Sequence, residues 1–239
     1  MARQHTYGQH FLRSPRVAAE LIGHSNVRAN DIVYDLGAGT GVITSALARR
    51  CRHVMAIEIE PATMIKLRQN VGELGNVTII EKDILKLQLP NEPYKIFANI
   101  PFALSSEVVR KFINTSNPPK SMYLIVQKQF ARKLTPGNDH FTSELSAEIA
   151  PWFAVRIRKN LRKYDFTPPP GVDTVLLEIK PHDKNLLPDT VKTSYRSFIE
   201  RCFHDQKFFR ILDKPFSPEL RPSQLTPEQW VELYAKVKP

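Results

Sequence analysis

The sequence of 239 residues is poor in the groups that disulfide-rich and metal-binding domains depend on. It has only two cysteines, Cys51 and Cys202, and neither has a companion at a metal-ligand spacing. Its seven histidines form no HExxH or similar pair. We therefore expect neither a disulfide framework nor a metal site. A GxSxG motif is also missing, so acyl transfer by a serine nucleophile has no support.

Long apolar runs are missing as well. No stretch approaches the ~18 apolar residues of a membrane span, and the beginning MARQHTYGQHFL lacks the apolar core of a signal peptide. We expect a cytoplasmic protein with no membrane partner. The length predicts one large domain, or one domain with a small appendage.

Acidic residues are outnumbered by basic ones. Thirty-four Lys and Arg against 24 Asp and Glu give a net charge of +10 and a pI near 9.6. Between Ala103 and Lys163, eleven basic residues stand against four acidic ones. A solvated basic face would give the same pattern, but a nucleic acid is the first candidate partner. The side chains expected to contact it are Arg110, Lys111, Lys128, Arg132, Lys133, Arg158, Lys159, Arg162 and Lys163.

Short apolar runs alternate with helix-like segments through the first two thirds of the chain. The runs predicted as strands are 32–36, 53–59, 77–80, 95–100 and 122–126, followed by 153–157 and 174–179 around a proline-rich turn. Strands that alternate with helices predict a parallel sheet, and the last two are close enough to pair antiparallel. After Pro181 the composition becomes helical. The fold class is therefore α/β, with domains at 1–181 and 182–239.

Polar signals follow the first three predicted strands. Three glycines at alternate positions, Gly37, Gly39 and Gly41, close the first strand and allow the backbone to approach a ligand. Val42 rules out the dinucleotide spacing GxGxxG. Glu58 ends the second strand and could accept ribose hydroxyls; Asp83 follows the third and could accept from an adenine amine. Each acid alone could be a surface charge, but together they predict a site for S-adenosylmethionine (SAM) at the carboxyl edge of the sheet.

The segment Asn99-Ile100-Pro101-Phe102 follows the fourth predicted strand. Pro101 favours an extended Ile100, which would turn the Ile100 carbonyl toward the site beside the Asn99 amide oxygen. Two acceptors could hold the two hydrogens of an adenine N6 amine and leave its lone pair free, and Phe102 offers a stacking face for an extruded base. The alternative is a strand-terminating turn followed by a core aromatic.

The motifs GQHFL, DLGAGTG, EIE, DIL, NIPF and FTPPPGV, in this order, resemble the rRNA adenine-N6 methyltransferase family. This family includes the erythromycin-resistance (Erm) enzymes and the small-subunit rRNA dimethyladenosine transferases. The resemblance covers essentially the whole chain, although His10 stands where the family often has Asn and NIPF replaces the commoner NIPY. It implies a Rossmann-like SAM-dependent methyltransferase sheet with a small helical C-terminal domain, acting on an unpaired rRNA adenine.

The resemblance also assigns site residues. Asn99 and Phe102 would hold the target amine and base, and Phe166 would cover the other face of the base. The implied catalytic set is Asn99, Ile100, Pro101, Phe102 and Phe166. The implied cofactor-binding set is Gln9, His10, Leu12, Gly37, Ala38, Gly39, Gly41, Glu58, Ile59, Asp83, Ile84 and Asn99.

Within the family, the segment QKQFARKL and the short ending QLTPEQWVELY resemble Erm enzymes, and no YGRLS segment of the small-subunit type is present. The expected substrate is an adenine of protein-free 23S rRNA, mono- or dimethylated by a monomer to give macrolide-lincosamide-streptogramin resistance. A small-subunit rRNA dimethylase is the alternative. A non-catalytic RNA-binding relative is a further one, against which the intact glycine loop and NIPF argue.

Overall fold

The computed structural model describes residues 10–135 and 142–237. Two compact units divide the chain: unit 1 is Met1–Gln129 with Arg156–Lys180, and unit 2 is Phe130–Val155 with Pro181–Pro239. The chain therefore crosses between the units at three places.

The division differs from the sequence-based domains 1–181 and 182–239, because residues 130–155 group with the C-terminal part of the chain. Two contacts within unit 2 explain this. The Tyr195 hydroxyl donates to the Ala147 carbonyl at 3.1 Å, and the Trp152 ring meets the Tyr195 ring edge-on. Composition could not predict such contacts, because they join segments far apart in the sequence.

A seven-stranded sheet runs through unit 1 in the order β4-β3-β2-β5-β6-β9-β7. The strands from β4 to β6 are parallel, and β9 runs antiparallel to β6. A separate antiparallel pair joins β1 to β8. The strands are β1 (Phe11–Leu12), β2 (Ile32–Leu36), β3 (His53–Glu58), β4 (Val77–Glu81), β5 (Lys95–Ala98), β6 (Met122–Gln127), β7 (Phe153–Leu161), β8 (Phe166–Thr167) and β9 (Thr174–Pro181).

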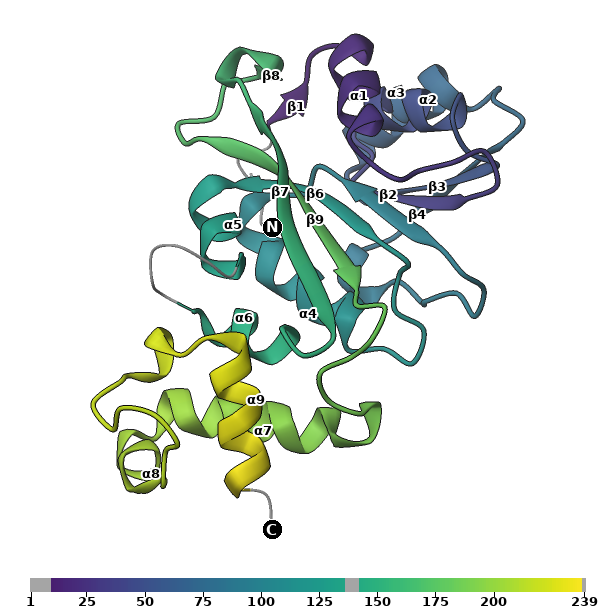
Figure 1. Ribbon diagram of the computed structural model, residues 1–239. Helices are drawn as coiled ribbons and strands as arrows, with labels where there is room; N and C mark the ends of the chain where they lie inside the picture. Colours follow the sequence, from purple (N-terminus) through teal and green to yellow (C-terminus); the bar gives the residue numbers. More distant parts are fainter. Residues whose placement is uncertain (1–9, 136–141, 238–239) are drawn as a thin grey trace, which may run out of the picture. The chain divides into compact units, whose positions relative to one another are not determined.

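Helices cover both faces of this sheet, with α1, α2 and α3 gathered on one face and α4 on the other (Figure 1). The helices that begin in unit 1 are α1 (Pro15–Gly23), α2 (Val42–Ala48), α3 (Pro61–Val71), α4 (Ser105–Ile113) and α5 (Lys128–Leu134). Short 3₁₀ turns connect the elements: η1 (Ile84–Lys86), η2 (Phe102–Leu104) and η3 (Lys163–Asp165).

Unit 2 is helical, as predicted for the end of the chain. Its elements are α6 (Glu144–Ile149), η4 (Asp189–Val191), α7 (Lys192–His204), α8 (Gln206–Ile211), η5 (Pro222–Gln224) and α9 (Pro227–Val237). Aromatic rings fill its interior: Tyr195 and Tyr234 meet edge-on, and Trp230 is fully buried among Phe198, Phe203 and Phe209. Large rings give a unit of this size enough apolar area to bury.

The burial of the strands and the cap of α1 agree with the sequence pattern. The parallel strands β2, β5 and β6 are almost entirely buried, as expected for a sheet covered on both faces. Ser14 caps α1 by accepting from the Arg16 N–H at 3.2 Å, with Pro15 in the first turn. The α/β class is confirmed.

The strand order determines where a ligand site can form. From β2 the chain moves outward through β3 to β4, and then returns to the other side of β2 at β5. Such a reversal opens a crevice at the carboxyl ends of the strands, where ligands of open α/β sheets bind. The loops that follow β2, β3, β4 and β5 all begin at this edge.

Gly41 is the position in this region where a side chain is least tolerated. Its φ is +87°, and an added Cβ would lie 2.9 Å from Val71 Cγ1 and 3.0 Å from Leu67 Cδ1. We predict that Gly41→Ala lowers the free energy of unfolding by about 1–3 kcal/mol in urea denaturation. The control is Gly75→Ala, where an added Cβ meets nothing within 4 Å. Equal stability of the two variants would contradict this reading.

Candidate active site

A pocket lies at the carboxyl edge of the sheet, entirely within unit 1. It is formed by β1, the glycine loop after β2, the ends of β3 and β4, and the segment after β5. The lining residues are His10, Phe11, Leu12, Gly37, Ala38, Gly39, Thr40, Val42, Ile43, Ile57, Glu58, Ile59, Lys82, Asp83, Ile84, Leu85, Asn99, Ile100, Pro101, Phe102 and Leu104. The motifs identified in the sequence therefore meet at one place.

The glycine loop turns sharply because three residues have positive φ. The φ values of Gly37, Gly39 and Gly41 are +71°, +56° and +87°, a region that side chains with a Cβ rarely adopt. The N–H groups of Gly37 and Ala38 both donate to the Ile57 carbonyl at 2.9 Å. These bonds tie the end of β2 to the end of β3.

The Glu58 carboxylate fixes the rest of the loop. One oxygen, Oε2, accepts from the Gly39 N–H at 2.8 Å; the other, Oε1, accepts from the N–H groups of Ile59 and Glu60, both at 2.8 Å. Glu58 is almost completely buried. A carboxylate offers about four acceptor positions. Glu58 thus has room for one more donor while its three backbone bonds are intact.

Gly39 has a second reason to lack a side chain. An added Cβ would lie 3.0 Å from Phe11 Cε1, whereas at Gly37 the nearest atom would be the Asn99 carbonyl oxygen at 3.7 Å. The Phe11 ring therefore rests directly on the loop. Phe11 belongs to the GQHFL motif, but the sequence analysis did not assign it to the site; only its place between His10 and Leu12 could have indicated it.

Asp83 begins a 3₁₀ turn at the pocket wall. Its Oδ1 accepts from the Leu85 N–H at 2.8 Å, which caps η1 and presents Ile84 and Leu85 to the pocket. Within the described residues, Asp83 Oδ2 has no hydrogen bond and is open to a ligand. Across the pocket, Ile59 is an exposed apolar side chain that also lines the wall.

Asn99 is held from the N-terminal strand. Its side-chain Nδ2 donates to the His10 carbonyl at 2.8 Å. This bond assigns the amide nitrogen to the protein and leaves the amide oxygen as an acceptor. The His10 ring stacks on Phe102, with 5.7 Å between ring centroids and 29° between planes. His10 Nδ1 also lies 2.8 Å from the Pro168 carbonyl oxygen, so this one residue links the motifs GQHFL, NIPF and FTPPPG.

Asp35 is a buried carboxyl on β2, two residues before Gly37. Its Oδ2 accepts from the Thr44 hydroxyl at 2.6 Å, while its Oδ1 is buried without a partner among the described residues. Burial raises the pKa of Asp35 to about 7, with the nearby Glu58 charge adding to the rise and the Thr44 hydrogen bond opposing it.

Two predicted site residues, Phe166 and Gly41, do not line the pocket, and a third lies outside the residues that the structure describes. Phe166 is completely buried in the core cluster with Phe97 and Leu176, so the structure does not place its ring over a target base. Gly41 is absent from the pocket wall, because the position that a Cβ would take there points at Val71 and Leu67 of α3. Gln9 lies outside the described residues.

The other predicted cofactor and catalytic residues line the pocket. They are His10, Leu12, Gly37, Ala38, Gly39, Glu58, Ile59, Asp83, Ile84, Asn99, Ile100, Pro101 and Phe102. Sequence reasoning did not assign the other eight lining residues, which are Phe11, Thr40, Val42, Ile43, Ile57, Lys82, Leu85 and Leu104. Lys82 stands inside the EKD motif, and its position beside Asp83 was the available signal.

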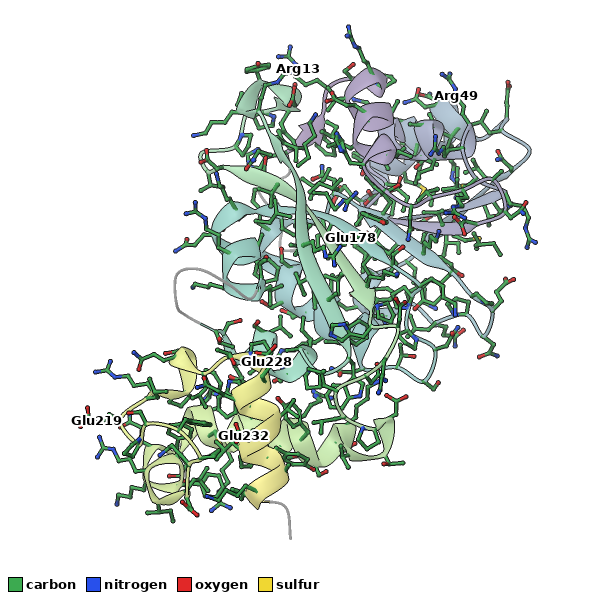
Figure 2. The ribbon with its side chains drawn as sticks, in the orientation of Figure 1. Arg13, Arg49, Glu178, Glu219, Glu228 and Glu232 are labelled. Atoms are coloured by element: carbon green, nitrogen blue, oxygen red, sulfur yellow. The ribbon has the colours of Figure 1, made fainter. Side chains whose placement is uncertain are left out.

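Several of the predicted nucleic-acid contacts are bonded within the protein. Lys111 Nζ donates to the Leu87 carbonyl at 2.8 Å, and burial lowers the pKa of this lysine. Arg158 Nη1 lies 3.7 Å from Oε2 of Glu178, the β9 residue labelled in Figure 2. Arg158 Nε donates to the His24 carbonyl at 3.1 Å.

The remaining basic residues differ in exposure. Lys159 pairs with Glu20. Lys128 and Arg110 are half-buried, and Arg132, Lys133, Arg162 and Lys163 are exposed. The exposed side chains fit contacts with phosphates better than the half-buried Lys111 does.

Comparison with known proteins identifies the family. A family model described as ribosomal RNA adenine dimethylase matches residues 2–214. The chain belongs to this family. A mitochondrial ribosomal RNA small subunit methyltransferase of Arabidopsis thaliana is 33% identical over 201 residues, which is 82% of this chain and 52% of that protein. The chain thus spans about half the length of this relative. An rRNA adenine N-6-methyltransferase of Limosilactobacillus reuteri is 29% identical over 240 residues, 96% of this chain and 95% of the relative.

Solved structures share the fold. The 23S rRNA methyltransferase ErmE superposes with a TM-score of 0.80 at 24% identity, over 96% of this chain and 100% of that chain. A dimethyladenosine transferase from Plasmodium falciparum gives 0.77 at 22% identity, over 95% and 96%. The Rossmann-like methyltransferase fold predicted from the sequence is confirmed.

Enzymes of the family are SAM-dependent, which confirms the predicted cofactor. The pocket fits this group, because Glu58 and Asp83 on its wall offer carboxylate acceptors for ribose hydroxyls and an adenine amine, and Ile59 and Ile84 add apolar surface beside them. Among the described residues, no helix is long and apolar enough to cross a bilayer. In the same part of the chain, no group of three or more His, Cys, Asp or Glu is placed to hold a metal ion.

The raised pKa of Asp35 predicts a pH-dependent stability. Between about pH 4 and the folded pKa of about 7, the folded carboxyl keeps a proton that the unfolded chain releases. The free energy of unfolding therefore falls as pH rises through this window, by up to about 1.4 kcal/mol per pH unit. Asp35→Asn removes the titrating group, so its urea-denaturation stability should fall less than that of the wild type. Parallel curves for the two proteins would refute the burial argument.

Proposed function

We propose that the protein transfers methyl groups to the N6 of a specific adenine in 23S rRNA, once or twice, and thereby confers macrolide-lincosamide-streptogramin resistance. The observation that supports the chemistry best is the fixed Asn99 side chain. Its nitrogen is bound to the His10 carbonyl, and its oxygen remains as an acceptor beside Phe102.

The residues of the pocket wall indicate how each part of SAM would be held. When bound, SAM supplies an electrophilic methyl group. Glu58 would accept one ribose hydroxyl at its remaining acceptor position, and a second hydroxyl would have to replace one of its backbone donors. Asp83 Oδ2 would accept from the adenine amine, between the apolar Ile59 and Ile84. The loop from Gly37 to Gly39 would border the methionine end.

The target base would be oriented by the segment after β5. The Asn99 amide oxygen and the Ile100 carbonyl would each accept one N6 hydrogen, which favours a pyramidal amine with a free lone pair. The N6 lone pair would take up the methyl group as the methyl–sulfur bond breaks and leaves a neutral thioether, and the amine would then lose one proton to water. The Phe102 ring provides the stacking face. Because His10 covers part of that ring, the base must use the open face or displace the imidazole.

Asn99 variants separate cofactor binding from transfer. We predict that Asn99→Ala binds SAM within a few-fold of wild-type affinity in calorimetry but loses about 10²-fold or more in methyl transfer, because the acceptor for the target amine is gone. Asn99→Asp keeps an acceptor but opposes a carboxylate to the His10 carbonyl, and we expect intermediate activity. Wild-type turnover of Asn99→Ala would exclude the proposed role.

Two observations support 23S rRNA as the substrate. The segment after β6 and the short C-terminal helix resemble Erm enzymes. The L. reuteri relative, an rRNA adenine N-6-methyltransferase, matches this chain along nearly its full length. A second candidate is dimethylation of small-subunit rRNA. It is favoured by the higher identity to the Arabidopsis small-subunit enzyme and by a dimethyladenosine transferase of Saccharomyces cerevisiae, 34% identical over 180 residues.

The two substrates can be told apart directly. Incubated with methyl-labelled SAM, the protein should modify an adenine in protein-free 23S rRNA, because a flipped base must first be accessible. It should be inactive on assembled large subunits and on 16S rRNA in small-subunit particles. In a sensitive bacterium it should raise macrolide tolerance, and Asn99→Ala should abolish that effect. Label near the 3′ end of 16S rRNA without a change in tolerance would establish the second candidate instead.

A further inference from the structure

Tyr164 differs from every other described aromatic residue of the chain. Its side chain is 60% exposed, whereas the other Phe, Tyr and Trp rings in residues 10–135 and 142–237 are buried or half-buried. Nothing in the core or the pocket uses this ring. An exposed aromatic ring offers a face on which a nucleic-acid base can stack.

A cation already lies over one face of the Tyr164 ring. The Arg162 guanidinium lies 4.7 Å from the ring centroid. Asp165 holds this arginine from the same turn, since its Oδ2 accepts from the Arg162 N–H at 2.9 Å and its Oδ1 lies 3.5 Å from Arg162 Nη2. The ring and the guanidinium are thus positioned together by η3 before any partner arrives, and a guanidinium on one face of an aromatic ring is a favourable cation–π contact.

The same turn is attached to the pocket wall. The Arg13 N–H donates to the Asp165 carbonyl at 2.9 Å. The preceding residues Phe11 and Leu12 pair with β8 and also line the pocket. Figure 2 shows Arg13 where β1 and β8 meet. Tyr164 therefore stands beside the strand that borders the target site, within unit 1.

The charge around Tyr164 suits a polyanion. Arg13, Arg162 and Lys163 are exposed there, while Asp165 in the same turn is buried. Lys163 is anchored by a 3.2 Å bond to the Gly171 carbonyl, which holds its positive charge close to the ring. A ring among exposed cations matches an unpaired nucleotide, whose base stacks while its phosphates lie near basic groups. A purely apolar protein partner would leave these charges unpaired.

We propose that Tyr164 and Arg162 form a stacking platform for a second unpaired base of the RNA substrate, distinct from the target adenine. This inference rests on the proposed function, because it requires an RNA substrate at the pocket. The platform would position the strand next to the target nucleotide, so its loss affects RNA binding and the KM for RNA but not SAM binding.

The test uses the full chain and a short unstructured RNA that contains 2-aminopurine, whose fluorescence is quenched on stacking. Tyr164→Ala should weaken binding by about 5- to 30-fold and reduce the quenching. Tyr164→Phe should keep both, and Tyr164→Leu, with apolar area but no ring, should lose both. The matched control Ile65→Ala truncates another exposed side chain of unit 1, 61% exposed on α3, and should bind normally.

Salt dependence separates stacking from charge. Tyr164→Ala should leave the slope of log K against log salt unchanged, whereas Lys163→Ala should flatten it by up to about 0.7. Wild-type affinity and quenching in both Tyr164→Ala and Tyr164→Leu would overturn the platform. If the wild type methylates no rRNA while Tyr164→Ala still loses binding and quenching, the proposed function fails and the platform stands.

Discussion

The buried Glu58 carboxylate is the interaction on which the active-site edge of the sheet depends. It accepts three backbone N–H groups, one from Gly39 in the glycine loop and two from Ile59 and Glu60, which precede α3. Three charge-assisted bonds hold the ends of β2 and β3 in one geometry. Glu58 therefore stabilises the fold even without a ligand. A substitution at Glu58 would affect the glycine loop as well as ligand binding.

Not all of the 34 Lys and Arg side chains are available to RNA phosphates. Arg158 and Lys159 are paired with Glu178 and Glu20, and the Lys111 ammonium is bound by a backbone carbonyl. Such pairs stabilise the fold, while residues such as Lys163 and Arg132 keep their charge on the surface. Recognition would then depend on a few exposed cations with rings and polar groups among them, rather than on a uniform basic face.

Sequence patterns predicted most of this site because its chemistry is local. The glycine loop, Glu58, Asp83 and the NIPF segment each sit at the end of a strand, and strand ends of a parallel sheet converge. The positions of three other predicted residues depend on packing that no motif reports: Phe166 lies in the core, Gly41 faces α3, and Lys111 donates to the Leu87 carbonyl. For the same reason, no motif predicts that residues 130–155 join unit 2, where Ala147 and Trp152 contact Tyr195.

The pairing of β1 with β8 determines when the site can be completed during synthesis. Phe11 and Leu12 emerge early from the ribosome, but their partners Thr167 and Phe166 follow more than 150 residues later. Until then the His10 carbonyl that orients Asn99 has no strand to hold it in place. Domains fold as their chains emerge, so the glycine loop can form first and the target-base side only near the end of translation. A chain released before β8 is made would have the glycine loop but no paired strand to support the His10–Asn99 bond.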